Sequence, residues 1–190
     1  MGKPGEGRYL QLRVMGGEGA CQNTVMHRFN DNLTHWHSNE ELLRALVTES
    51  VDFVLIGGLA VAWYCEARQA DDLDLLVAPT PENSERIHKA LLSLNLSNFN
   101  VDSFAKPAVQ VRLEQRYHAK LLTPSTGGPS YAEIVQSSSP AKLLNVPIRV
   151  PSRAMLVRMK LGAIAANHDG REKHLADVEL LLQGDRATNE

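Results

Sequence analysis

Two aspartates, Asp72 and Asp74, stand two positions apart at the start of an apolar run that ends at Ala78. On a β-strand, residues at this spacing point to the same side and lie roughly 7 Å apart, so flexible carboxylates there can converge on one ion. Mg²⁺ prefers oxygen ligands, and two-metal sites for phosphoryl transfer hold their ions about 3.5–4 Å apart. The pair therefore predicts a site for Mg²⁺ or Mn²⁺. A solvated strand edge is the alternative.

A diglycine, Gly57-Gly58, ends the preceding apolar run at residues 53–56. Because glycine has no Cβ, the backbone of such a turn approaches a phosphate closely, and the following helix offers free N–H groups to the anion. The segment matches neither a P-loop, which needs Gly-Lys-Ser or Gly-Lys-Thr, nor the glycine spacing of the dinucleotide-binding fingerprint. Alone, the diglycine is equally compatible with a tight turn. Together with the aspartates it predicts a phosphate-binding turn.

Alternating strands and helices must position these residues. Ser38 and Glu41 form a capping-box pattern, which predicts a helix that begins at Ser38 and ends near Ser50. Apolar periodicity and β-formers predict the other elements around the diglycine and the aspartates: a strand at 53–56, a helix at 59–68 and a strand at 73–78.

The second half of the chain adds helices and an antiparallel portion. Thr80 is the expected cap of a helix that has Pro81 in its first turn. Gln115-Arg116 is short enough to join two strands in a hairpin. The expected elements are strands at 109–114, 117–123 and 146–150 and helices at 153–166 and 173–182. The predicted fold class is α/β (α+β), a mixed sheet flanked by helices with a helical C-terminal part.

A chain of 190 residues suits one domain with a short appendage. Residues 1–37 are rich in glycine and show no hydrophobic period, so they are predicted to be a flexible N-terminal extension. Residues 38–150 are expected to form the core, and residues 151–190 a helical segment packed on it.

Composition excludes several classes of protein. The chain has 20 Lys and Arg against 22 Asp and Glu, a net charge of -2, which argues against a globally basic nucleic-acid binder. Two cysteines cannot form a disulfide framework and suit a reducing cytosol. The longest charge-free apolar stretch, Phe53–Cys65, has 13 residues, whereas a bilayer span needs roughly 20. A cytoplasmic location without membrane association is expected.

The order of strand, Gly57-Gly58, helix and Asp72-Leu73-Asp74 resembles the DNA polymerase β-like nucleotidyltransferase superfamily. The signature of that family is an apolar strand ending in Gly-Gly or Gly-Ser, a helix, and then Asp-hydrophobic-Asp. Arg68 resembles the Arg of the Arg-x-Thr-x-Asp-x-Asp stretch in small bacterial members, the abortive-infection toxins and minimal nucleotidyltransferases. Here Ala70 replaces the Thr of that stretch.

A second similarity lies near the C-terminus. Small members often carry a Lys on one helix and then Arg-x-Lys-Asp with a further Asp. The residues of this chain that resemble this pattern are Lys160, Arg171, Lys173 and Asp177. His174 stands where the first of those Asp residues would fall. The resemblance covers roughly residues 40–182.

The resemblance implies an enzyme that binds a nucleoside triphosphate with Mg²⁺ or Mn²⁺ and transfers a nucleoside monophosphate to an acceptor hydroxyl. The acceptor would be tRNA, a protein or a small molecule, and the toxin-like branch implies an antitoxin partner. The residues that this implies are Asp72 and Asp74 for catalysis and metal, Gly57, Gly58, Arg68 and Lys160 for the nucleotide, and Glu114, Lys120, Lys173 and Asp177 as accessory groups.

Active members of that family usually add a third carboxylate from a later strand, often within Val-Asp-Leu-Leu-Thr. The matching stretch here is 118–123, and Lys120 stands at the carboxylate position. A protonated lysine cannot ligate Mg²⁺ and repels it, although it can bind a phosphate directly. Glu114 is a candidate substitute, with a solvated strand residue as the alternative.

Basic residues gather between positions 141 and 173, which fits an anionic partner. They are Lys142, Arg149, Arg153, Arg158, Lys160, Arg171 and Lys173. One interpretation is a clamp for a triphosphate and an RNA acceptor, and the other is a solvated helical face.

Two functional hypotheses follow. The first is a metal-dependent nucleotidyltransferase. The second is a catalytically degenerate member that binds nucleotide or a partner without turnover. An unrelated α/β domain with exposed aspartates is the third and weaker possibility.

Overall fold

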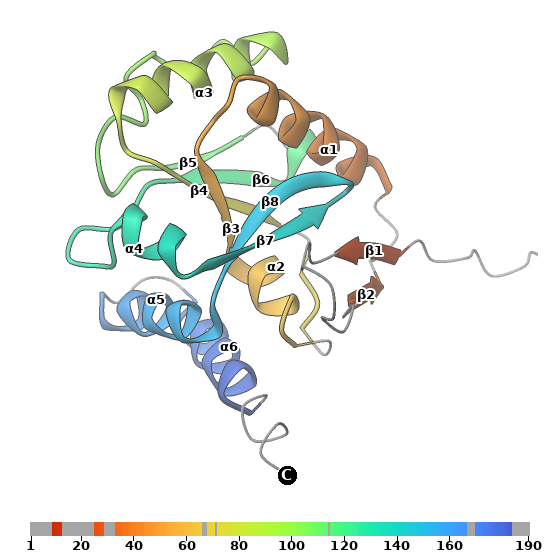
Figure 1. Ribbon diagram of the computed structural model, residues 1–190, viewed down its shortest axis with the longest axis vertical. Helices are drawn as coiled ribbons and strands as arrows, with labels where there is room; N and C mark the ends of the chain where they lie inside the picture. Colours follow the sequence, from red (N-terminus) through yellow and green to blue (C-terminus); the bar gives the residue numbers. More distant parts are fainter. Residues whose placement is uncertain are drawn as a thin grey trace, which may run out of the picture.

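The computed structural model describes residues 9–12, 25–28, 33–65, 68–70, 72–113, 115–166 and 170–183. The elements follow one another as in Figure 1: β1 (Tyr9–Leu12), β2 (Val25–Arg28), α1 (Leu33–Thr48), β3 (Phe53–Ile56), α2 (Gly57–Ala62), β4 (Leu73–Val77), α3 (Pro81–Ser93), β5 (Gln110–Arg112), the 3₁₀ helix η1 (Gln115–Tyr117), β6 (Ala119–Leu122), α4 (Tyr131–Gln136), β7 (Ser138–Leu143), β8 (Val146–Pro151), α5 (Arg153–Ala165) and α6 (Arg171–Gln183).

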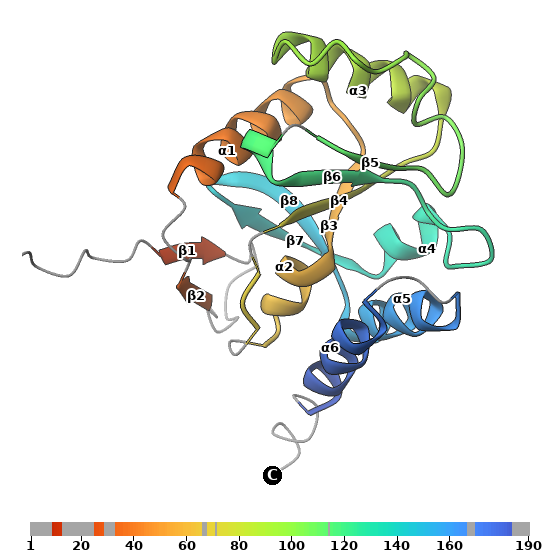
Figure 2. The same cartoon turned by 180° about the vertical axis from the view of Figure 1, so that it is seen from behind.

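A four-stranded mixed sheet lies at the centre, with its strands in the order β3-β4-β6-β5. β4 runs antiparallel to β3 and parallel to β6, and β5 closes the sheet as an antiparallel edge strand. Two further two-stranded sheets, β1-β2 and β7-β8, stand apart from it. In both views α1 and α3 lie toward one end of the molecule, and the pair α5-α6 lies at the opposite end (Figures 1 and 2). The expected mixed α/β fold flanked by helices, with helices at the C-terminus, is confirmed.

The sheet buries apolar side chains on both faces. All four residues of β3 are buried, as are Leu73, Leu75 and Val77 on alternate positions of β4. The main core joins these three residues to α1, α2 and α3. The opposite face carries a smaller cluster of Val54, Ile56, Leu76 and Ile134. Because neighbours on a strand alternate, Asp74 shares this second face with Leu76.

Several elements appear where the sequence predicts them. β3 occupies residues 53–56, and α3 begins at Pro81, where the Asn83 backbone N–H donates to Thr80 Oγ1 at 3.2 Å. The strand expected at 73–78 and the helices expected at 153–166 and 173–182 lie within one or two residues of β4, α5 and α6.

Two predicted helices have wrong boundaries. α1 begins at Leu33, so Ser38 lies inside the helix and does not cap it. α2 begins at the diglycine itself and ends at Ala62, well before residue 68. The hydrophobic pattern does not locate either end of α2, because residues 53–65 are apolar throughout and a buried strand and a buried helix are equally apolar.

The prediction of a tight hairpin at Gln115-Arg116 is also wrong. η1 occupies this connection, and Arg112 pairs with Lys120 across β5 and β6. A hairpin centred on Gln115-Arg116 would pair residue 114 with residue 117, which is one residue out of register with the observed pairing. A shift of one residue exchanges the two faces of a strand, so the error changes which side chains meet.

Four further elements are not predicted by the sequence pattern: strands β1 and β2, helix α4 and strand β7. β7 contains Pro140 and few β-formers, and its pairing with β8 depends on a turn in which Leu144 and Asn145 both have positive φ, 51° and 60°. Such a turn matches the twist of a hairpin. α4 begins with a capping box between Ser130 and Glu133.

None of the helices in the described ranges combines the length and the apolar content that crossing a bilayer requires.

Candidate functional site

The sheet register brings a row of side chains together across its second face. Asp74 pairs with Ile56 on one side and with Lys120 on the other, and Lys120 pairs with Arg112 on the edge strand. Paired residues in a sheet point to the same side, so the row holds one carboxylate and two basic groups. Asp72 precedes β4 by one residue and lies on the same side as Asp74.

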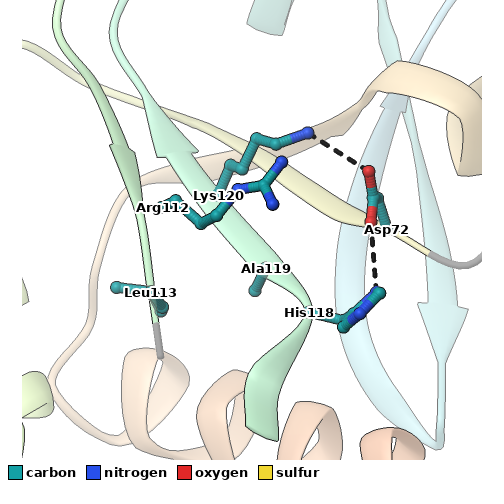
Figure 3. Close-up of a pocket in the computed structure, with 6 residues that line it drawn as sticks. All are labelled: Asp72, Arg112, Leu113, His118, Ala119 and Lys120. Carbon is teal, nitrogen blue, oxygen red and sulfur yellow. Dashed lines mark hydrogen bonds and ion pairs between the residues drawn. The ribbon is translucent and has the colours of Figure 1, made fainter. Parts of the chain in front are cut away.

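Lys120 lies between the two aspartates. Its Nζ donates a hydrogen bond to Asp72 Oδ2 at 3.2 Å and lies 3.6 Å from Asp74 Oδ1, which is an ion pair without a hydrogen bond. The other oxygen of Asp72, Oδ1, lies 3.2 Å from His118 Nδ1. Figure 3 shows Asp72 held between Lys120 on β6 and His118 just before it. The ammonium thus stands where two carboxylates converge.

The two carboxyl groups have opposite pKa shifts. Burial alone would raise the pKa of Asp72, but the hydrogen bond and charge of Lys120, together with the charges of His118 and Lys173, lower it below its ordinary value. Asp74 is more deeply buried, so desolvation raises its pKa, and Lys120 compensates only in part. At neutral pH the ionised form of Asp74 therefore costs stability, and Lys120 is the nearest group that offsets this cost.

The diglycine turn lies directly against the aspartate pair. Gly57 has a φ of 72°, and a Cβ on it would lie 2.1 Å from Asp74 Oδ2. Glycine is needed at this position for two reasons: other residues are strained at a positive φ, and a side chain here would collide with the Asp74 carboxylate. Thus the structure brings Gly57 and Asp74 together, as the predicted site requires, and the space beside Gly57 is filled by the carboxylate.

Arg68 and Lys160 share one buried carboxylate. Arg68 Nε donates to Asp177 Oδ1 and Lys160 Nζ donates to Asp177 Oδ2, each at 2.6 Å. The side chain of Asp177 is 1% exposed and that of Lys160 10%. Burial alone would raise the pKa of Asp177, but the two hydrogen bonds and charges lower it. The three residues tie α5 and α6 to the segment before β4.

This cluster adjoins the diglycine. A Cβ on Gly58 would lie 3.0 Å from Arg68 Nη2, a buried atom with no hydrogen-bond partner among the described residues. Lys160 also lies close enough to lower the pKa of Asp74 by its charge, although burial of that carboxyl has the larger and opposite effect. The nucleotide-binding roles of Gly58, Arg68 and Lys160 remain predictions, because both cations already have Asp177 as a partner.

A cavity of about 270 Å³ opens beside the aspartates on the side of β5 and β6. Its lining residues are Asp72, Arg112, Leu113, His118, Ala119 and Lys120 (Figure 3). Lys173 is exposed on α6 and acts on Asp72 through its charge. Glu114, the candidate for the third carboxylate, lies outside the described residues.

A divalent ion does not fit this arrangement while Lys120 is in place. Two carboxylates are the right donors for Mg²⁺, but an ion between them would meet an ammonium within about 4 Å and be repelled. No group of three or more His, Cys, Asp or Glu side chains in the described part of the chain is placed to hold a metal ion.

Sequence reasoning missed Arg112 and His118. His118 precedes β6 and has a positive φ of 44°, so the alternation of a strand does not place its side chain. Arg112 could not have been found without the register of β5, for which the chain offers no turn signal.

Replacement of Gly57 by alanine is expected to destabilise the protein through Asp74. Gly127→Ala is the matched control, because Gly127 has a φ of 78° and a Cβ there meets nothing within 4 Å. Urea unfolding should give a loss of about 1 kcal/mol for Gly127→Ala from backbone strain and about 2 kcal/mol more for Gly57→Ala. Equal losses would mean that Asp74 does not press against the turn.

Replacement of Asp177 by asparagine should lower the free energy of unfolding by about 3–5 kcal/mol at pH 7, because two buried cations lose their counter-charge. Since the pKa of Asp177 is lowered in the folded state, the difference from wild type should be full above the unfolded pKa and shrink as pH falls through the folded pKa. The exposed Asp102→Asn serves as control, and a loss that does not depend on pH would contradict the ion-pair origin.

Replacement of Asp74 by asparagine should raise the free energy of unfolding at pH 7, whereas the Asp177 variant lowers it. The raised pKa of Asp74 means that its ionised form costs stability at neutral pH, so the variant should unfold at a higher urea concentration than wild type at pH 7. The gain should decline as pH falls through the folded pKa of Asp74 and vanish once the carboxyl is protonated in both states. A destabilised variant at pH 7 would show that the attraction of Lys120 outweighs desolvation.

Comparison with known proteins supports the fold. No protein-family model matches the chain, and no curated protein matches its sequence. An antigenic nucleotidyltransferase-like protein from Paracoccidioides brasiliensis superimposes with a TM-score of 0.50 at 13% identity, over 79% of this chain and 76% of that one. ANT(2")-Ia in complex with adenylyl-2"-tobramycin gives a TM-score of 0.47 at 16% identity, over 79% of this chain and 88% of that one. The first of these establishes a nucleotidyltransferase-like fold.

Proposed function

We propose that this protein binds a nucleotide at the aspartate pair and that the Lys120 ammonium takes the place of a divalent metal there. It is thus a nucleotidyltransferase-fold protein that does not depend on Mg²⁺ for binding and has little or no transfer activity. The observation that carries the proposal is the position of Lys120 Nζ, 3.2 Å from Asp72 and 3.6 Å from Asp74.

A tethered ammonium and a metal ion differ in what they do for a triphosphate. Both offset negative charge on the carboxylates, the metal ion two charges and the ammonium one, and so help an anion to approach. A lysine, however, is a single positive charge with three donors, whereas Mg²⁺ carries two charges and coordinates phosphate oxygens directly. Binding survives the exchange because it needs only charge, while nucleotidyl transfer loses the ion that stabilises the developing charge on the phosphorus-bound oxygens.

The charges around the pair favour an anionic ligand. Five basic side chains lie in the cavity or around the diglycine and the aspartate pair, against three carboxylates, so the net charge is two positive without His118. The basic groups are Arg68, Arg112, Lys120, Lys160 and Lys173, and the acidic groups are Asp72, Asp74 and Asp177. Cations gathered in a cleft raise the local concentration of anions.

The second candidate is a metal-dependent nucleotidyltransferase that moves a nucleoside monophosphate to RNA, a protein or a small molecule. The close approach of Asp74 to Gly57 favours it, because this retains the turn and the carboxylate that the predicted chemistry needs. It requires Lys120 to leave the carboxylates when an ion binds. A toxin role and an antitoxin partner belong to this candidate.

Replacement of Lys120 by aspartate separates the two candidates. Calorimetry with ATP should show binding by wild type that is the same with EDTA and with Mg²⁺. Lys120→Asp should lose about tenfold or more in affinity without metal, since a charge-assisted contact is removed, and regain it with Mg²⁺ or Mn²⁺. The exposed Lys89→Asp serves as control for the change in net charge.

Transfer of label from α-labelled ATP to total RNA or protein completes the test. Little transfer by wild type and increased transfer by Lys120→Asp with Mg²⁺ support a lysine in the place of a metal. Efficient Mg²⁺-dependent transfer by wild type would establish the second candidate. Absence of ATP binding by either protein would contradict both.

A further inference from the structure

The edge of the sheet next to the aspartate pair holds two cations side by side. Arg112 on β5 and Lys120 on β6 are direct register partners and point to the same side of the sheet. Like charges directly opposite each other in an antiparallel pair are destabilising. Lys120 is compensated by Asp72 and Asp74. Within the described ranges, Arg112 makes no hydrogen bond or ion pair, and its side chain is exposed.

Both cations line the same cavity of about 270 Å³. Figure 3 shows the Arg112 guanidinium beside the Lys120 side chain, with His118 and Asp72 on the far wall. The volume is large enough for a phosphate group with part of the molecule that carries it. Leu113 adds a buried apolar contact. The cavity lies on the β5–β6 side of Asp72, away from the diglycine, which lies on the β3 side of Asp74.

We propose that this cavity is a binding site for a phosphate group, and that Arg112 is the residue that recognises it. The guanidinium is a planar fork of donors that matches two phosphate oxygens at once, and Lys120 adds a point charge from the neighbouring strand. The single carboxylate in the lining, Asp72, already accepts from Lys120 and lies against His118, which reduces its repulsion of an anion. A bound phosphate also removes the repulsion between the two cations.

This inference rests on the proposed function and extends it, because the phosphate site gives the ligand a second point of recognition besides the aspartate pair. The phosphate belongs either to the nucleotide itself or to a second, phosphorylated ligand. The two sources share the same chemistry at Arg112, and they differ in whether one ligand displaces the other.

Arg112→Gln tests the site, with Arg44→Gln as the matched control. Arg44 is also an exposed arginine, but it lies on α1 and pairs with Glu40. Calorimetry without Mg²⁺ should be run with ATP, adenosine and pyrophosphate on wild type and both variants. Arg112→Gln should weaken pyrophosphate about tenfold, through loss of a charge-assisted contact, and leave adenosine unchanged. Arg44→Gln should match wild type with every ligand.

The ATP titration identifies the source of the phosphate. If Arg112→Gln weakens ATP as much as pyrophosphate, and pyrophosphate displaces ATP, then the cavity holds the phosphates of the nucleotide. If ATP is unaffected and binds together with pyrophosphate, then the cavity serves a second, phosphorylated ligand. Equal pyrophosphate affinity in wild type and Arg112→Gln, or no pyrophosphate binding by wild type, overturns the inference.

The outcome is separable from that of the proposed function. If Lys120→Asp loses ATP binding while Arg112→Gln binds ATP and pyrophosphate as wild type does, the proposed function stands and this phosphate site is refuted. If the protein does not bind ATP but binds pyrophosphate in a way that depends on Arg112, this phosphate site stands and the proposed function is refuted. Because the Arg112 side chain makes no hydrogen bond or ion pair within the described residues, equal melting temperatures of wild type and Arg112→Gln are expected and exclude unfolding as the cause of any loss.

Discussion

The contact between the Lys120 ammonium and two carboxylates sets the electrostatics of the whole cleft. Asp72 and Asp74 point to the same side at the beginning of β4, and Asp74 has little access to water. Two such charges need a cation nearby, and a lysine on the adjacent parallel strand supplies it within the chain. The cost of burying Asp74 remains visible in its raised pKa. Asp74 thus costs stability in the ionised form even with Lys120 beside it.

A second charge cluster contrasts with the first. Asp177 is buried as deeply as any acidic group described, yet its pKa is lowered, because two cations donate to its two oxygens. The first cluster has two carboxylates around one ammonium and the second has two cations around one carboxylate. The second holds α5 and α6 against the segment before β4, next to Gly58. It therefore fixes the position of the diglycine turn, while the first remains open to the cavity.

How much could be read from the sequence depended on the distance over which the relevant contacts act. The strand at 53–56, the cap at Thr80 and the common side of Asp72 and Asp74 follow from local patterns, and the structure agrees with each. The partnership of Arg68 with Asp177 joins residues that are 109 positions apart, and no local pattern encodes it. The pairing of Arg112 with Lys120 was missed for a different reason: the predicted hairpin is one residue out of register, and such a shift moves a side chain to the other face of the sheet.

The identity of residue 120 decides which kind of ligand the cleft attracts. With a carboxylate at this position, three acids would face one another, and a bound metal ion or a proton would be needed to reduce their repulsion. With lysine, one of the two aspartate charges is offset within the chain. The lining of the cavity then holds two cations, Arg112 and Lys120, against the single carboxylate of Asp72, so its charge is positive. Under the proposed function, a single residue on β6 therefore changes the preferred ligand of the site from a cation to an anion, without a change of fold.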